Sequence, residues 1–342
     1  MSCVTHSRFS LVLLATVMLL APAVPAAAHG SLRPEVEVFI DEMARKHDFS
    51  TAELRRLFSQ VRSRPAILRA ISTPSEALPW HQYRGRFVNE TRITDGVRFW
   101  QQNAATLARA AERYGVAQEI IVATIGIETL YGRHKGTYGV LEALTTLAFE
   151  YPRRAGFFRG ELEEFLLVAR DNRFDALALK GSYAGAMGIA QFMPSSYRRY
   201  AVDFDGDGRV DLWSTPVDAI GSVANYYHSH GWRDGEAVVV PADAASSGDD
   251  GVSVANLRPV ITVAEFRRRG VQPLSLVSDD AKAALFVVQA EHGAQPYLGL
   301  HNFYVITRYN RSINYALVVH ELSRELRSAF GAGPVAANGQ NQ

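Results

Sequence analysis

One carboxylate stands in a stretch of sequence that is otherwise almost entirely apolar. Glu128 follows the run from Ile120 to Ile127, and Leu130 and Tyr131 come after it. A segment that is apolar on nearly every side is typical of a helix buried on most of its faces. Burial penalises an ionised carboxylate, so a buried, unpaired Glu has a raised pKa and tends to stay protonated. A neutral carboxylic acid can donate a proton to a leaving-group oxygen, so Glu128 is a candidate general acid.

The same pattern also fits a structural Glu that is hydrogen-bonded to backbone or to an Arg, since structural networks perturb pKa values too. A second stretch, from Gly185 to Tyr197, favours the catalytic interpretation. It holds too many Gly, Ala and Ser residues for an ordinary core helix, and it ends in Pro194-Ser195-Ser196. Small residues let the backbone approach a ligand closely. Gln191 and Phe192 would supply an amide and an aromatic wall to a site there.

Both stretches resemble blocks of the lytic murein transglycosylase B family. The run from Ser182 to Tyr197 is similar to the family signature, and Ile125-Gly-Ile-Glu-Thr129 followed by Tyr131-Gly132 is similar to its catalytic helix. Further blocks match in the same order along the chain, at Tyr151-Pro-Arg-Arg154, Asp218 to Tyr226 and Asn302 to Asn310. The resemblance covers roughly residues 32–328, and several long motifs in the right order are hard to obtain by chance.

The resemblance implies a lysozyme-like enzyme of cell-wall turnover that cleaves peptidoglycan glycan strands at the β-1,4 bond from N-acetylmuramic acid to N-acetylglucosamine. Glu128 would protonate the leaving oxygen and then, as a carboxylate, take the proton of the muramic 6-hydroxyl. That hydroxyl would close onto C1 as a 1,6-anhydro ring, so no water is consumed and no cofactor turns over. The substrate's own N-acetyl group would stabilise the cationic sugar. The resemblance also implies a substrate groove, whose residues are Tyr83, Arg153, Arg154, Ser182, Gln191, Tyr226, Tyr309, Asn310 and Tyr315.

Two other functions stay open. Standard glycosidases use two carboxylates, and the matching blocks hold no second acid. A hydrolytic muramidase would need an ordered water where the muramic 6-hydroxyl should sit. A non-catalytic peptidoglycan-binding or calcium-sensing protein is the alternative outside the enzymes. The acid at position 128 argues against it, because a binding module has no need to bury one there.

Four of the candidate residues also have ordinary structural explanations. Tyr83 alone is more often a core residue than a ligand, since Tyr is usually partly buried. Arg153 and Arg154 between helices fit a solvated corner or a helix C-terminal partner, although guanidinium groups suit carboxylates such as a muramic lactyl or peptide group. His320 fits a helix face better than a metal site, since no second His or Cys stands at metal spacing.

An acidic loop predicts a calcium site. In the run from Asp203 to Ser214, acids stand at positions 1, 3, 5 and 9, and Gly208 lies at position 6. That spacing of oxygen ligands around a turning glycine is the EF-hand geometry, and four acids this close would repel one another without a cation. Ser214 stands where an EF-hand has its closing Glu, and an Asx-rich turn is the alternative. Asp218 is the nearest later carboxylate, and the resemblance implies that a late Asp closes the loop. We expect a structural Ca²⁺ whose ligands are Asp203, Asp205, Asp207, the Arg209 carbonyl, Asp211 and Asp218.

The start of the chain predicts export. Residues 1–28 fit a signal peptide, with Arg8 before an apolar run from Leu11 to Leu20 and an A-x-A cleavage site at Ala26-Ala27-Ala28. The apolar run is short for a membrane span, and the only cysteine, Cys3, precedes it rather than marking a lipid-attachment point. We therefore expect a soluble periplasmic protein with no membrane span, no disulfide and no thiol chemistry.

The composition fits a globular protein of this kind. The chain has 342 residues, 47% hydrophobic and 21% charged, and the 314 residues after position 28 suffice for one large or two modest cores. The formal net charge is +1, so no basic patch suggests nucleic acid as a partner. Peptidoglycan strands are the expected partner, and other cell-wall enzymes are candidates.

Hydrophobic periodicity predicts an α+β fold that is mainly α, a lysozyme-like helical core with added parts. Short β-branched runs at Val238–Val240, Val252–Val254 and Val260–Val263 predict strands, and Leu285–Val288 and Tyr304–Thr307 extend that character. A last helix is expected from Asn314 to Arg327. The expected units are an N-terminal helical domain at 29–92, a core at 93–233 with the loop 203–218, a β insertion at 234–284, a segment completing the core and helical domain at 285–328, and a disordered tail at 329–342.

Overall fold

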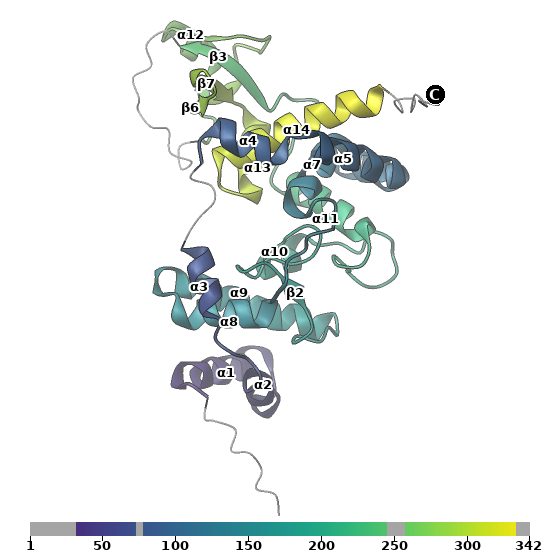
Figure 1. Cartoon of the computed structure of the whole chain (residues 1–342), viewed down its shortest axis with the longest axis vertical. Helices are drawn as coiled ribbons and strands as arrows, with labels where there is room; N and C mark the ends of the chain where they lie inside the picture. Colours follow the sequence, from purple (N-terminus) through teal and green to yellow (C-terminus); the bar gives the residue numbers. More distant parts are fainter. Residues whose placement is uncertain (1–31, 73–77, 245–256, 333–342) are drawn as a thin grey trace, which may run out of the picture.

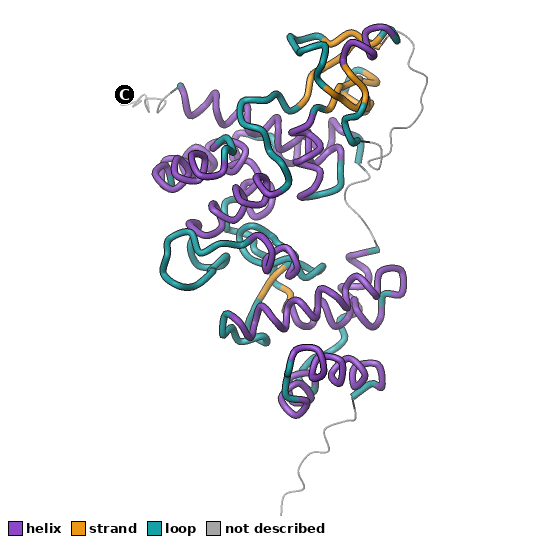
Figure 2. The backbone as a smooth tube through the Cα atoms, turned by 180° about the vertical axis from the view of Figure 1, so that it is seen from behind, coloured by secondary structure: helices purple, strands orange, loops and turns teal. Residues whose placement is uncertain are grey.

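The computed structural model of the chain describes residues 32–72, 78–244 and 257–332. This part is mainly helical and carries a five-stranded sheet at one end (Figures 1 and 2), which confirms the predicted fold class. The predicted signal peptide and the predicted strand Val252–Val254 lie outside the described residues. Within the described ranges, every helix is too short or too polar to cross a membrane.

Three N-terminal helices pack on a helical pair. The helices α1 (Pro34–His47), α2 (Thr51–Phe58) and α3 (Pro65–Ile71) lie near α8 (Val140–Glu150) and α9 (Ala155–Asp171), with the short 3-10 helix η2 (Pro152–Arg154) between the last two (Figure 1). Phe39 of α1 is fully buried, and its ring centroid lies 6.0 Å from those of Phe58 and Phe149. Ser50 caps α2 by accepting a bond from the Glu53 amide, as expected for half of a capping box.

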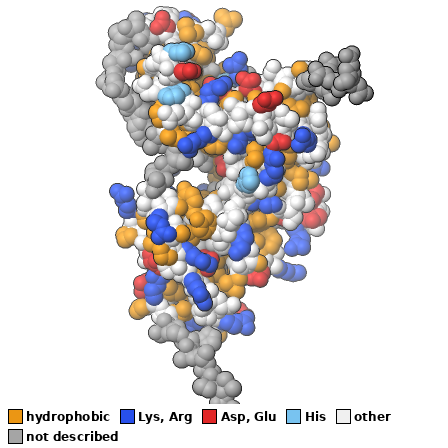
Figure 3. All heavy atoms as spheres, in the orientation of Figure 1, with side chains coloured by type: hydrophobic (Ala, Val, Ile, Leu, Met, Phe, Trp, Pro, Cys, Tyr) orange, Lys and Arg blue, Asp and Glu red, His pale blue; other side chains and the backbone are white. Residues whose placement is uncertain are grey.

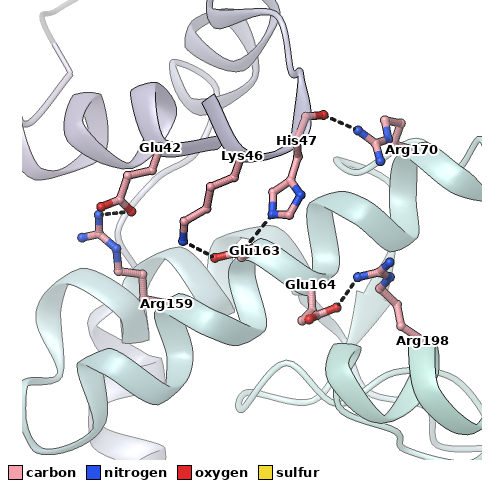
Figure 4. A network of polar contacts seen from close by, with 8 residues as sticks. All are labelled: Glu42, Lys46, His47, Arg159, Glu163, Glu164, Arg170 and Arg198. Atoms are coloured by element: carbon pink, nitrogen blue, oxygen red, sulfur yellow. Dashed lines mark hydrogen bonds and ion pairs between the residues drawn. The ribbon is translucent and has the colours of Figure 1, made fainter. Parts of the chain in front are cut away.

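Ion pairs join α1 to α9 around this apolar contact (Figure 4). Arg159 donates to Glu42 at 2.9 Å, and Glu163 pairs with His47 at 2.7 Å and with Lys46 at 3.5 Å. On the far side of α9, Arg198 of α10 (Pro194–Tyr200) donates to Glu164 at 2.8 Å. Opposite charges on these facing surfaces therefore neutralise one another locally.

The predicted N-terminal domain at 29–92 does not pack as one unit. The helices α4 (Trp80–Phe87) and α5 (Glu90–Gln102) contact α14 (Ile313–Gly331), and α4 also contacts the sheet, whereas α3 contacts α8 (Figure 1). The helices separate because each one buries its apolar face against a different neighbour. Trp80 and Tyr83 of α4 are buried in this second location, which the chain reaches only after the segment 73–77.

Helix α7 lies at the centre of the upper part of the molecule. It spans Gln118–Thr129 and contacts α5, α6 (Ala104–Tyr114), α11 (Pro216–Ser229) and α14 (Figure 1). All residues from Glu119 to Gly126 are buried, as the nearly continuous apolar run predicts. A helix surrounded on this many sides holds the residues at its end in fixed positions.

The sheet is antiparallel, with strand order β4-β6-β7-β3-β5. Its strands are β3 (Val239–Ala244), β4 (Ile261–Thr262), β5 (Val271–Pro273), β6 (Lys282–Ala290) and β7 (Gly293–Gly299), and α12 (Val263–Arg268) follows β4. The sheet therefore extends beyond the predicted insertion at 234–284, because its long hairpin is made by β6 and β7. A small two-stranded pair, β1 (Tyr138–Gly139) with β2 (Lys180–Gly181), lies in the core.

Two predictions near the C-terminus differ from the structure. The predicted strand at Tyr304–Thr307 is wrong, because these residues belong to α13 (His301–Tyr309). A short apolar run buried on several sides cannot be assigned from periodicity alone. Helix α14 continues to Gly331, past the predicted end at Arg327 and into the predicted tail. The ring of Phe330 stacks on Trp100 with centroids 4.3 Å apart, which holds this last turn.

The attachment of α1 should depend on apolar packing more than on its ion pairs. Phe39→Ala should lower the free energy of unfolding by about 3–5 kcal/mol, because it leaves a cavity in a closed cluster. Glu163→Gln, which breaks the pairs with Lys46 and His47, should cost about 1 kcal/mol or less, because partly exposed pairs contribute little. Urea unfolding of both variants measures the two values. Equal losses would show that the ion pairs hold the helix.

Candidate active site

The end of α7 places Glu128. The helix stops at Thr129, and Leu130, Tyr131 and Gly132 follow with φ values of 51°, 60° and 86°. A left-handed conformation is strained for Leu and Tyr. The Tyr131 hydroxyl donates to the Arg92 carbonyl at 2.8 Å, and its ring packs on Phe99, which offsets that strain.

Thr129 connects this helix end to the glycine-rich loop. Its hydroxyl donates to the Ile189 carbonyl at 2.9 Å and accepts from the Gly132 amide at 3.0 Å. The residue before it in sequence is Glu128, so the acid cannot move without disturbing the loop. The two stretches singled out from sequence are therefore adjacent in space.

Glu128 itself is half-buried rather than enclosed by apolar residues. The Tyr315 hydroxyl donates to its Oε1 at 2.6 Å, across 187 residues of sequence. The expectation of an unpaired acid is thus wrong, because a buried tyrosine from α14 reaches it. A hydroxyl donor stabilises a carboxylate, and it can keep its bond when that carboxylate changes protonation.

Tyrosine rings surround the acid. Tyr309 stacks on Tyr315 with centroids 6.3 Å apart, and it also contacts Tyr226 at 4.8 Å and Tyr227 at 5.6 Å. Burial raises the pKa of Tyr309 and of Tyr315 well above the ordinary value, and the charge of Glu128 raises both pKa values further. These phenols stay neutral and act as hydrogen-bond donors. Tyr227 was not predicted, although it adjoins the predicted Tyr226.

The glycine-rich loop is held by its own polar side chains. The Ser182 hydroxyl accepts from the Ala186 amide at 3.0 Å, and the Gln191 amide donates to the Gly188 carbonyl at 2.8 Å. Phe192 is 2% exposed, and its ring contacts Tyr226 at 5.5 Å. These three predicted substrate contacts therefore build the loop. Phe192 in particular is a core residue behind the tyrosines.

A cavity of about 810 Å³ lies beside this cluster. Four of the predicted groove residues line it, namely Arg154, Tyr226, Tyr309 and Asn310. The others lie outside its lining; Arg153 is exposed, and Tyr83 is buried on α4 against Phe87. Tyr315 and Glu128 sit behind Tyr309 through the ring stack and the hydroxyl bond already described.

One further carboxylate lines the cavity. Glu161 is only 5% exposed, and its oxygens accept bonds from the Ser195 amide at 2.9 Å and the Ser195 hydroxyl at 2.6 Å. Burial raises its pKa above the ordinary value, and the two Ser195 bonds oppose that rise. Both oxygens are thus committed to the start of α10. The geometry favours a structural role for this acid over that of a second catalytic group.

The acidic loop folds around a carboxylate from α11. Asp203, Asp205 and Asp218 each offer an oxygen within 4.8 Å of the others. Asp218 is 2% exposed, and its two oxygens accept from the amides of Phe204 and Asp211 at 2.7 Å. Burial raises the pKa of Asp218 above its ordinary value, and the bonds from the two amides oppose that rise. The loop can hold a divalent ion.

Two of the predicted carboxylate ligands lie outside that group of three. Asp207 accepts from the Arg209 amide at 2.8 Å, and Asp211 accepts from the Trp213 amide at 2.8 Å. These are Asx turns, which shape the loop. The structure thus brings together the first, the third and the late acid of the predicted set. The late acid comes from the following helix.

Comparisons with known proteins give consistent results. Residues 31–324 match the family model described as Transglycosylase SLT domain. Over 306 residues the chain is 44% identical to the membrane-bound lytic murein transglycosylase B of Escherichia coli (strain K12), covering 86% of this chain and 83% of that protein.

Two solved structures are similar over most of their length. The E. coli lytic transglycosylase Slt35 in complex with calcium superposes with a TM-score of 0.81 at 44% identity, over 87% of this chain and 94% of that one. SltB3 from Pseudomonas aeruginosa, in complex with NAG-anhNAM-pentapeptide, gives a TM-score of 0.74 at 32% identity, over 86% of this chain and 79% of that one.

The glycine-rich loop should tolerate no side chain at Gly188. Its φ is +69°, and a Cβ there would lie 2.5 Å from the Leu212 carbonyl oxygen. Gly188→Ala should therefore cost about 2 kcal/mol or more of stability. Gly160→Ala on α9, where a Cβ meets nothing within 4 Å, is the matched control and should stabilise by up to about 1 kcal/mol. Melting curves of both variants test this, and equal stability would contradict it.

Proposed function

The chain belongs to the family of transglycosylase SLT domains and is a lytic murein transglycosylase, and we propose that Glu128 performs both proton transfers of its reaction. The hydrogen bond from Tyr315 to the Glu128 carboxyl carries this proposal. Glu128 lies at the end of a buried helix, and its partner Tyr315 stacks on Tyr309, which lines the tyrosine-walled cavity. Such a site suits sugars, whose CH faces stack on rings while their hydroxyls bond to polar tips.

In the proposed first step, the proton of Glu128 passes to the glycosidic oxygen and the bond from C1 to that oxygen breaks. The substrate's N-acetyl group stabilises the cationic muramic sugar. The Tyr315 hydroxyl, which already donates to Oε1, stabilises the carboxylate that the step creates.

In the second step, the muramic 6-hydroxyl oxygen attacks C1 and its proton passes to the Glu128 carboxylate, which restores the acid. The absence of a second free acid in the described cavity lining supports this route, since Glu161 is committed to Ser195. A hydroxyl already on the substrate has a large effective concentration, so it can outcompete water. NAG-anhNAM-pentapeptide, the fragment in the SltB3 complex, is the kind of product that this route yields.

We also propose that a calcium ion is held by Asp203, Asp205 and Asp218. The relative from E. coli was solved in complex with calcium, and the three clustered carboxylates supply the hard oxygen ligands that calcium prefers. The ion would neutralise a buried acid and join the loop to α11. Its contribution is structural, since Glu128 lies on a different helix.

Peptidoglycan lies outside the cytoplasm, so we propose that residues 1–28 direct export to the periplasm. The basic start, the apolar run and the A-x-A site of this segment support the proposal. The E. coli relative is named as membrane-bound.

The proposed role of Glu128 predicts a large loss of rate in one variant. Glu128→Gln should keep the fold but lower the rate of sacculus digestion by about 10³-fold or more, because the amide can neither give nor take the proton. Glu164→Gln on the exposed face of α9, where the acid pairs only with Arg198, should digest sacculi at the normal rate. A Glu128→Gln variant that retains a tenth of the activity would contradict the assignment.

Mass analysis of the same digests separates the transglycosylase route from hydrolysis. New ends should be 1,6-anhydro-muramic acid, lighter than a hydrolysed end by one water and resistant to borohydride reduction. Mostly reducible muramic ends would favour the hydrolytic alternative, even with Glu128 essential.

Calcium should stabilise the protein through the acidic loop. Binding to the folded state alone adds about 2.7 kcal/mol when calcium is at 100 times its Kd, which corresponds to a rise in melting temperature of roughly 4 °C for a chain of this length. Asp203→Asn should abolish most of that rise, whereas Asp171→Asn, at an exposed site of α9, should keep it. Identical melting curves in calcium and in chelator would show that the loop is a turn without an ion.

A further inference from the structure

The cavity beside the tyrosines has a basic wall that the proposed reaction does not use. Arg199 on α10, Arg308 at the end of α13 and Arg311 just after it line the cavity together with Arg154. They come from segments about a hundred residues apart in sequence. In Figure 3 the surface is hollowed between the upper and lower parts of the molecule, and Lys and Arg side chains stand around the hollow.

Among the described residues, three of these arginines lack counter-charges, in contrast to their neighbours outside the cavity. Arg198 pairs with Glu164 at 2.8 Å, and Arg159 pairs with Glu42 at 2.9 Å. Within the described residues, neither Arg199, Arg308 nor Arg311 forms an ion pair. The protein therefore neutralises the basic groups of α9 and α10 everywhere except where they face this space.

The acid in the cavity lining does not serve as their partner. Both oxygens of Glu161 accept bonds from Ser195, and its side chain is 5% exposed. Arg154 is the arginine close enough to lower the pKa of Glu161, and its guanidinium also lies 4.1 Å from the Phe157 ring centre. Within the part of the chain that the structure describes, the three remaining arginines thus present uncompensated positive charge.

The His230 ring lies close enough to both Arg199 and Arg308 to sense their charges. His230 stacks on Tyr226 with ring centroids 4.2 Å apart, and its Nδ1 donates to the Tyr226 carbonyl at 2.7 Å. Burial lowers the pKa of His230, and the charges of Arg308 and Arg199 lower it further. The ring is therefore neutral at neutral pH, and it lies within electrostatic reach of both guanidinium groups.

The basic wall is continuous with the sugar site. The Tyr226 hydroxyl donates to the backbone carbonyl of Arg308, which fixes the last turn of α13. Tyr309, next in sequence, stacks on Tyr315, which in turn bonds Glu128. A ligand whose sugar lies by the tyrosines can therefore reach the arginines with a group attached to that sugar.

We propose that Arg199, Arg308 and Arg311 bind the free carboxylates of the peptide carried by the muramic acid residue, and so favour strands whose peptides have free carboxylates. This inference rests on the proposed function. In a peptide-bearing strand the sugar rings are neutral and the muramic lactyl carboxyl is taken up in the amide bond to the peptide, so negative charge near the scissile bond comes from the attached peptide. Guanidinium groups bind carboxylates with two parallel hydrogen bonds, which gives both charge and shape recognition.

The test compares two synthetic tetrasaccharides of alternating N-acetylglucosamine and N-acetylmuramic acid. Both carry the same pentapeptides; one has free peptide carboxylates, and the other has them converted to carboxamides of nearly the same shape. The protein should cleave the first with a kcat/KM about tenfold or more higher, mainly through a lower KM, because charge-assisted bonds are lost with the amide. That preference should shrink as salt screens the charges.

The triple variant Arg199→Gln, Arg308→Gln, Arg311→Gln should lose the preference while cleaving the carboxamide substrate about as fast as the original protein. Arg198→Gln, the paired neighbour outside the cavity, is the control and should keep the preference. If the triple variant does not fold, the exposed single variants Arg199→Gln and Arg311→Gln test the same idea. Each should lower the preference for the carboxylate substrate about threefold, since each removes one of three donors.

Two results overturn this inference alone: equal cleavage of both substrates by the unaltered protein, or an intact preference in the variants. A fall in the rates on both substrates by the same factor also overturns it, since it indicates a structural role for the wall. Failure of the unaltered protein to cleave either substrate, or reducible ends on both products, would instead contradict the proposed function.

Discussion

The hydrogen bond from Tyr315 to Glu128 is the interaction on which the rest of the site depends. It joins α14 to the end of α7 across 187 residues. It can form only because both helices are packed on several sides, and α14 is held in turn by α5, α7 and α13. The tyrosines that wall the cavity follow from the same packing, since Tyr309 stacks on Tyr315 and Phe192 lies behind it.

Backbone strain connects this acid to the glycine-rich loop. Leu130 and Tyr131 take left-handed conformations directly after the helix, which cost free energy for residues with a Cβ. The Tyr131 ring occupies the space that a Cβ at Gly96 or Gly126 would fill, so these small residues are needed where the ring packs. Thr129 then bonds the loop at Ile189. The position of the acid and the shape of the loop therefore depend on each other.

Charge is distributed differently in two regions of the same chain. Between α1 and α9, Arg159, Lys46 and His47 meet acids (Figure 4). In the cavity, by contrast, Arg199, Arg308 and Arg311 meet no acid among the described residues, although Glu164 pairs with the residue next to Arg199. Exposed pairs contribute little to stability. The contrast is thus better explained by what the cavity binds than by the stability of the fold.

The sequence by itself determined the features that depend on local pattern. The apolar run around Glu128, the acids of the 203–211 loop and the mainly helical class follow from composition and spacing along the chain. Only the tertiary structure decided which residues from distant segments come into contact. It placed Tyr315 beside Glu128 and Asp218 beside Asp203. It also buried Phe192 in the core and placed residues 304–307 in a helix. Each of these outcomes is set by burial between distant segments, which no local window of sequence contains.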